Sequence, residues 1–159
     1  AASLWRAEKP QGEGRYLRAA LFSSVGLFAV GGILGFMIAG LDIDIPAHYH
    51  GTTVAVTIAF MGLTYYLLPR LGFGKLPERM ATWQPTIYAS GQLLHIIGLA
   101  WSGGYGVQRK TAGAAQALDG LAQTAGMGLM GLGGLVSVIG GLLFLIVAYK
   151  SMRNRPTGA

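Results

Sequence analysis

The chain has 159 residues, of which 52 % are hydrophobic and only 11 % are charged, and its net charge is +6. The charged fraction lies well below the ~25 % of ordinary soluble proteins, so the composition excludes a soluble domain and indicates a membrane protein. The basic residues form no single patch or stripe, which argues against a nucleic-acid-binding protein. The lack of cysteine excludes disulfides and thiolate metal sites.

Several stretches are long and apolar enough to cross the ~30 Å hydrocarbon core, which takes about 20 residues in a helix. The predicted spans are residues 17–40, 47–68, 85–102 and 122–149. We expect each to be an α-helix, because lipid cannot satisfy free backbone groups and no stretch alternates like a barrel strand. The sequence therefore predicts an all-α membrane protein with four transmembrane helices.

The loops between these spans predict the orientation. Four crossings place both termini on one side, together with ten of the twelve basic residues. Only Arg109 and Lys110 lie on the other side, so the positive-inside rule predicts that both termini are cytoplasmic. The predicted domains are a cytoplasmic segment, 1–16, a transmembrane domain, 17–149, and a cytoplasmic basic tail, 150–159. The expected location is the cell inner membrane.

Two histidines, His48 and His50, open the second span in the stretch IPAHYHGTT, near the predicted outer face. Positions i and i+2 of a helix point ~200° apart, so the pair cannot share one ion unless the backbone unwinds. Histidine is uncommon in membrane segments, and neutral imidazole is a good axial ligand of heme iron. We therefore interpret the pair as ligands of two different hemes. Gly51 is expected to leave room for a macrocycle, and Tyr49 to lie between the two rings.

For His95 and for the Arg109–Lys110 pair, the sequence allows both a structural and a functional interpretation. A hydrogen-bonded structural histidine is the simpler reading for His95, which lies beside Gln92 in the third span. Arg109 and Lys110 are either solvated loop charges or a cationic clamp for an acidic group near the outer face. The glycines in the first and fourth spans, in VGGILG and GMGLMGLGGL, are interpreted as sites of close helix packing.

The stretch IPAHYHGTTVAVTIAFMGLTYYLLPRLG resembles the tenth transmembrane helix of heme-copper oxidase subunit I, with His-aromatic-His near its outer end and an aromatic-Pro-basic terminus. LAWSGGYGVQRK is similar to the end of the eleventh helix and the basic loop after it. The first and fourth spans would then be the ninth and twelfth helices. The resemblance implies that His48 ligates a high-spin heme and His50 a low-spin heme. It also implies that Arg109 and Lys110 pair with heme propionates.

The chain departs from the family pattern at several positions. Tyr49 stands where phenylalanine is common. Gly40-Leu41 occupies the place of a His-Asp or His-Asn pair that helps to bind a metal at the outer face, so we expect no such site. Asp42 and Asp44 do not fit that spacing, and we interpret them as loop carboxylates.

The resemblance implies the heme-ligating C-terminal portion of a terminal respiratory oxidase core, an oxidoreductase of the cytochrome c oxidase type. Electrons would pass from the low-spin heme to a high-spin heme and copper site that reduces O₂ to water. Three histidines cannot supply every ligand, so partner helices from the rest of subunit I would hold the copper. Other oxidase subunits, an electron donor such as cytochrome c and membrane lipid are further expected partners, and nucleic acid is not. Two alternatives remain: a nitric oxide reductase-type core and a heme-free structural or assembly subunit.

Overall fold

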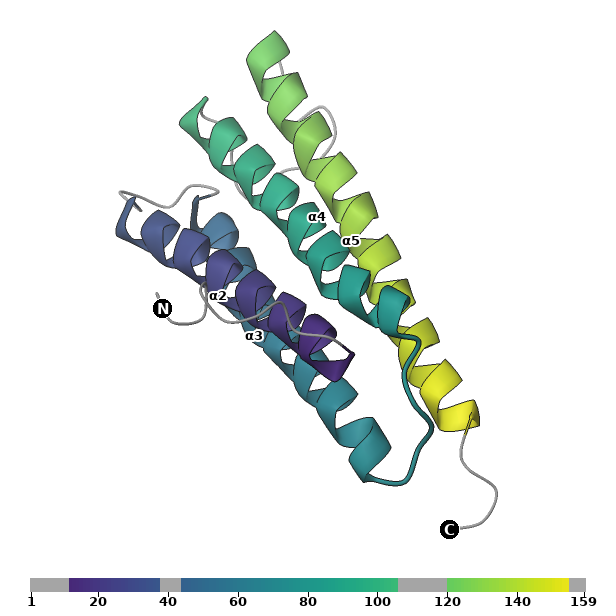
Figure 1. Cartoon of the computed structure of the whole chain (residues 1–159). Helices are drawn as coiled ribbons and strands as arrows, with labels where there is room; N and C mark the ends of the chain where they lie inside the picture. Colours follow the sequence, from purple (N-terminus) through teal and green to yellow (C-terminus); the bar gives the residue numbers. More distant parts are fainter. Residues whose placement is uncertain (1–11, 38–43, 106–119, 155–159) are drawn as a thin grey trace.

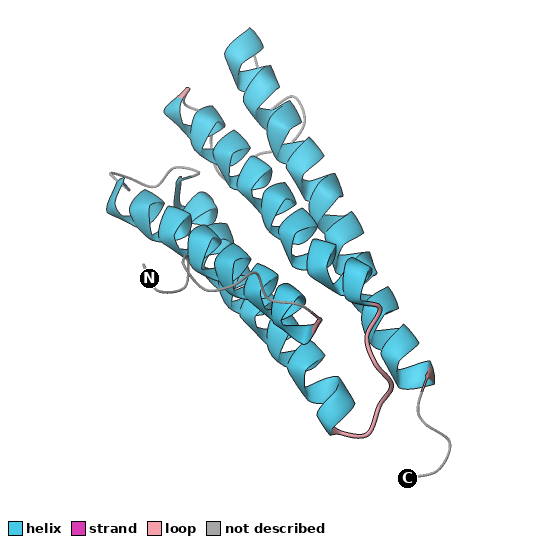
Figure 2. Ribbon diagram, viewed as in Figure 1, coloured by secondary structure: helices cyan, strands magenta, loops and turns pink. Residues whose placement is uncertain are grey.

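The computed structural model describes residues 12–37, 44–105 and 120–154, and this part of the chain is helical apart from turns and short connections. Its helices, in chain order, are α2 (Glu13–Met37), α3 (Asp44–Arg70), α4 (Glu78–Gly104) and α5 (Leu121–Arg153). Consecutive helices run in opposite directions (Figures 1 and 2). The start of α3, the end of α4 and the start of α5 therefore lie at the same end of the bundle.

The membrane character of the fold is clear for three of these helices. α2, α3 and α5 are long and apolar enough to cross a membrane. α4 has 27 residues and is therefore about 40 Å long, but its polar side chains lower its hydropathy. α4 also contacts all three other helices. The all-α membrane fold is thus confirmed, while the crossing of α4 and the orientation of the termini stay predictions.

α4 begins at Glu78, well before the predicted span that opened at residue 85. Hydropathy placed the start at Pro85 because the first two turns of the helix are polar. Pro85 is instead a buried residue inside the helix. Pro77 precedes the helix in an extended conformation, and Glu78 in the first turn interacts favourably with the helix dipole.

The C-terminus of α3 is set by a glycine. The helix runs through Pro69, where the sequence predicts its stop, and the chain reverses at Gly72, whose φ is +82°. The Gly72 amide donates to the Pro69 carbonyl at 3.2 Å, and the Phe73 amide donates to the Leu68 carbonyl at 3.1 Å. These two bonds form a Schellman motif, which needs a left-handed residue that glycine adopts without strain.

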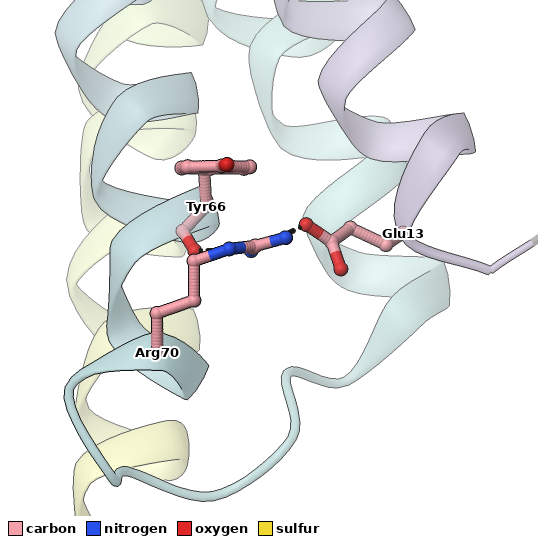
Figure 3. Close-up of polar contacts among 3 residues, drawn as sticks. All are labelled: Glu13, Tyr66 and Arg70. Carbon is pink, nitrogen blue, oxygen red and sulfur yellow. Dashed lines mark hydrogen bonds and ion pairs between the residues drawn. The ribbon is translucent and has the colours of Figure 1, made fainter.

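Arg70 ties this end of α3 to the start of α2 (Figure 3). Its Nη1 donates to Glu13 Oε1 at 2.6 Å and to the Tyr66 carbonyl at 2.7 Å. Its guanidinium lies over the Tyr66 ring, 3.5 Å from the centroid. Arg15 and Glu78 form a second, looser pair at 3.5 Å between α2 and α4. Both pairs are exposed, so they order the helix ends more than they stabilise the fold.

Glycines bring α4 and α5 into backbone contact. A Cβ built on Gly98 would lie 2.6 Å from the Gly126 carbonyl oxygen, and one on Gly133 would lie 2.6 Å from the Gly91 carbonyl oxygen. A Cβ on Gly140 would lie 2.7 Å from the Cα atom of Tyr88. The α5 glycines therefore recur at two-turn intervals along one seam, and the predicted packing role of the fourth span's glycines is confirmed.

A hydrogen-bonded cluster around Gln84 joins α3, α4 and α5 in the part of the bundle away from the histidines. Gln84 is fully buried, and its Oε1 accepts a bond from the Tyr65 hydroxyl at 3.0 Å. Its Nε2 donates to the Gly140 carbonyl at 3.1 Å and contacts Met61 Sδ at 3.3 Å. Every polar atom of this side chain has a partner, which is what a buried amide in an apolar layer requires.

The α4–α5 seam predicts unequal effects for two nearby glycines. Gly133→Ala should destabilise the fold by about 1–3 kcal/mol, because the new methyl group would meet backbone atoms of α4 that cannot yield. The new methyl group of Gly131→Ala meets no atom of the described residues within 4 Å, so this substitution should be neutral or slightly stabilising through helix propensity. Denaturant unfolding of the purified protein in detergent, followed by circular dichroism, measures both. Equal effects at the two positions would contradict the seam.

Candidate functional site

The two histidines at the start of α3 face different neighbours. His48 Nδ1 lies 2.8 Å from the Gly31 carbonyl oxygen of α2. The His50 ring packs instead against the His95 ring of α4, with the centroids 4.7 Å apart and the planes inclined at 58°. The helix is continuous through both positions, so their side chains leave opposite sides of one backbone. An ion held by one ring is out of reach of the other.

The His48 ring packs against Gly31 and Gly35 of α2, and we call this packing site the seat of His48. The Gly31 carbonyl can only accept a hydrogen bond, so Nδ1 carries the proton and Nε2 presents its lone pair. A Cβ built on Gly35 would lie 2.6 Å from His48 Nδ1 and 2.8 Å from Cε1, so the ring fills the space that this glycine leaves. Fixing the tautomer through the far nitrogen is how proteins usually prepare a histidine to bind a metal.

The surroundings of His50 are built by α4. His95 Nδ1 donates to the Met130 carbonyl of α5 at 3.0 Å, which holds the His95 ring against His50. This bond fits the structural reading of His95. Gln92, one turn before His95, is 9 % exposed and lies close enough to act on the His50 ring. Sequence reasoning noted Gln92 and His95 in one span but not that both meet His50.

The two residues next to His50, Tyr49 and Gly51, differ in burial. Tyr49 is 59 % exposed, and its ring lies beside that of His48, with the ring centroids 5.4 Å apart. Gly51 is buried against α2: a Cβ built on Gly31 would lie 2.7 Å from the Gly51 carbonyl carbon. The expectation that Gly51 leaves room for a macrocycle is wrong, because α2 already fills that space.

The remaining predicted site residues are placed only in part. Arg109, Lys110 and Asp42 lie outside the described residues. Asp44 is the first residue of α3 and not a loop residue. Within the described ranges, no three histidine, aspartate or glutamate side chains gather into a metal site.

The histidine pair on one continuous helix, packed among membrane-length helices, belongs to a multi-pass helical membrane protein. Over residues 4–149 the chain matches the family described as "Cytochrome C and Quinol oxidase polypeptide I", and it is a member of that family. The predicted relationship to heme-copper oxidase subunit I is thereby confirmed.

Two relatives are uncharacterized proteins. One, from Rickettsia prowazekii, is 34 % identical over 147 residues, which cover 86 % of this chain and 28 % of the relative. The other, from Aquifex aeolicus, is 36 % identical over 58 residues, which cover 36 % of this chain and 15 % of the relative. The chain therefore matches less than a third of the length of either protein. No solved structure matches it.

Family membership implies heme and copper in the complete assembly, and the start of α3 fits a heme ligand. His48 has a fixed tautomer that leaves Nε2 as an acceptor, and His50 lies beside a buried amide oxygen that has no partner among the described residues. Both histidines are half-buried in the described part of the chain, so each is partly shielded from bulk water.

The seat of His48 can be tested without any cofactor. Gly35→Ala should push the imidazole away from the Gly31 carbonyl, so His48 should change from the single Nδ1–H tautomer to a mixture. Nitrogen NMR of histidine-labelled protein in detergent distinguishes the two tautomers. Gly32→Ala is the matched control, because a Cβ at this position meets no atom of the described part of the chain within 4 Å. If both variants kept the Nδ1–H tautomer, the proposed seat would be disproved.

Proposed function

We propose that this chain forms the heme-ligating C-terminal part of a heme-copper oxidase core. The observation that carries the proposal is the opposite projection of His48 and His50 from one unbroken helix, toward α2 and α4 respectively. A single-metal site would need both rings on one side. Two hemes, one on each side of α3, need the arrangement that the helix provides.

Each histidine would have its own task. His48 would bind the iron of the high-spin heme through Nε2, because Gly31 holds the proton on Nδ1. His50 would bind the low-spin heme on the α4 side. These hemes supply electron transfer and, with copper, the reduction of O₂ to water. The second low-spin ligand and the copper ligands would come from other helices of subunit I.

Arg109 and Lys110 would complete the site at the same end of the bundle. They belong to the segment that joins the end of α4 to the start of α5, and these two helix ends lie at the same end of the bundle as the start of α3. Propionates at the edge of a low-dielectric layer are costly to leave unpaired, and charge-assisted hydrogen bonds are strong. A role in propionate binding would explain why these two cations lie on the side that the positive-inside rule disfavours.

The proposal also includes the number of membrane crossings and the side on which the termini lie. α4 would be the fourth membrane span, with both termini in the cytoplasm and the histidines near the outer face of the inner membrane. The low hydropathy of α4 is compatible with a crossing, because the helix contacts all three others and its polar residues Gln84, Gln92 and Ser102 are buried among them. Other oxidase subunits and an electron donor such as cytochrome c would bind the assembled complex.

A heme-free structural subunit is the second candidate. It is favoured by the bonds of His48 to Gly31 and of His95 to Met130, which need no cofactor. The visible spectrum of the purified complex separates the two functions. A nitric oxide reductase-type core would share the histidine pair and would differ in the metal ligands of the other helices.

Substituting the histidines one at a time should cause separate losses. His50→Leu should remove the low-spin heme signal, whereas His48→Leu should abolish CO binding at the high-spin heme and leave the low-spin signal. Optical and electron paramagnetic resonance spectra of the purified complex measure both. His95→Phe is the control: it removes the bond to the Met130 carbonyl but keeps an aromatic ring beside His50, and it should keep both hemes because His95 is not assigned as a ligand. A complete heme spectrum in His48→Leu and His50→Leu would refute the ligand assignment.

Removing a propionate partner should shift the heme potentials. Arg109→Gln should lower the midpoint potential of the heme whose propionates it contacts, because loss of a nearby positive charge disfavours the added electron. Arg153→Gln, in the last turn of α5 at the opposite end of the bundle, should leave the potential unchanged. Redox titration of the purified complex provides the comparison. An equal response of the two variants would contradict the propionate contact and would mean that Arg109 is a solvated loop charge.

A further inference from the structure

One buried polar atom on α4 has no hydrogen-bond partner in the part of the chain that the structure describes. Gln92 is only 9 % exposed, and its Oε1 makes no hydrogen bond of normal geometry within the described residues. A buried acceptor without a donor costs roughly 1–3 kcal/mol, so such atoms are rare in stable folds. Gln84 on the same helix shows the contrast, because its buried amide is fully bonded.

The unpartnered oxygen lies beside His50. Gln92 and His95 are one helical turn apart, and the His95 ring packs on the His50 ring at 4.7 Å. The Gln92 amide is close enough to interact with that imidazole. The bond from His95 Nδ1 to the Met130 carbonyl holds His95 in place, so it limits how far the His50 ring can turn.

The chemistry of a ligating imidazole completes the argument. An imidazole that binds iron through one nitrogen carries a proton on the other, and that N–H needs an acceptor when it is buried. His48 has such an acceptor in the Gly31 carbonyl of α2. On the other face of α3, Gln92 Oε1 is a buried acceptor that has no donor among the described residues.

We propose that Gln92 is a positioning residue for His50: its Oε1 accepts the hydrogen bond from the imidazole N–H and leaves the other ring nitrogen to bind iron. This inference rests on the proposed ligation of a heme by His50. The two histidines of α3 are then oriented alike, each from a neighbouring helix, one by a backbone carbonyl and the other by a side-chain amide.

The bond has an electronic consequence. An acceptor on the N–H of a ligating imidazole makes the ring a stronger electron donor, which stabilises the ferric heme and lowers its midpoint potential. Losing the acceptor should raise the potential. An acceptor of equal reach, such as glutamate, should keep the potential at or below its original value, since either oxygen of the carboxyl group can take the hydrogen bond.

The test uses the purified membrane complex that contains this chain. Redox titration gives the midpoint potential of the low-spin heme in Gln92→Leu and Gln92→Glu, and electron paramagnetic resonance reports its axial ligand field. We expect the potential to rise in Gln92→Leu and to stay level or fall in Gln92→Glu. Gln84→Leu is the matched control: it removes a buried amide from α4 near the other end of the bundle and should not move the potential.

The outcomes separate this inference from the function on which it rests. If His50→Leu keeps the low-spin heme, the proposed ligation is wrong. If His50→Leu loses that heme but both Gln92 variants shift the potential alike, or neither shifts it, then Gln92 only fills space and this inference alone fails. A higher potential with a changed axial ligand field in Gln92→Leu, and an unchanged ligand field in Gln92→Glu, would support it, because the charge of glutamate alone moves the potential but the ligand field changes only when the acceptor of the imidazole N–H is lost.

Discussion

The unbroken helical backbone of α3 at His48 and His50 is the constraint on which the site depends. Pro46 lies in the first turn, where its missing N–H costs nothing, and Gly51 follows the pair without breaking the helix. Side chains two residues apart must therefore diverge, and each ring meets a different neighbour. One unwound peptide would bring both rings to the same side, where they could share one ion, and would remove the arrangement that the proposed ligation of two hemes requires.

Close helix packing at glycines determines which carbonyl groups the His48 and His95 rings contact. Because Gly31 has no side chain, α2 lies close enough to α3 for its carbonyl to reach His48. On the other side, Gly133 lets α4 lie directly on α5, which brings the Met130 carbonyl to His95. These glycines contribute no chemistry of their own. They set the distances at which a carbonyl can orient an imidazole, so packing and ligand geometry depend on the same residues.

Periodicity and hydropathy were sufficient to predict the helices, the opposite projection of the histidines and the packing role of the α5 glycines, because these follow from local sequence. The partners of the side chains were not predictable. The contact between His50 and His95 depends on the register between α3 and α4, and the Arg70–Glu13 pair joins residues far apart in the chain. Gly51 shows the difference: a missing side chain creates space, but only the tertiary structure shows that α2 occupies it.

The polar residues of α4 explain why a helix in contact with all the others is also the least apolar. A polar group in the membrane must find a partner, and Gln84 finds its partners within the bundle. Toward the histidine end, His95 is bonded to α5, while Gln92 Oε1 has no partner in the described part of the chain. The buried Gln84 amide thus has its hydrogen bonds where α4 packs against other helices, whereas the buried Gln92 amide beside His50 lacks one within the described residues. That asymmetry is expected if α4 supports a ligand at one end and packing alone at the other.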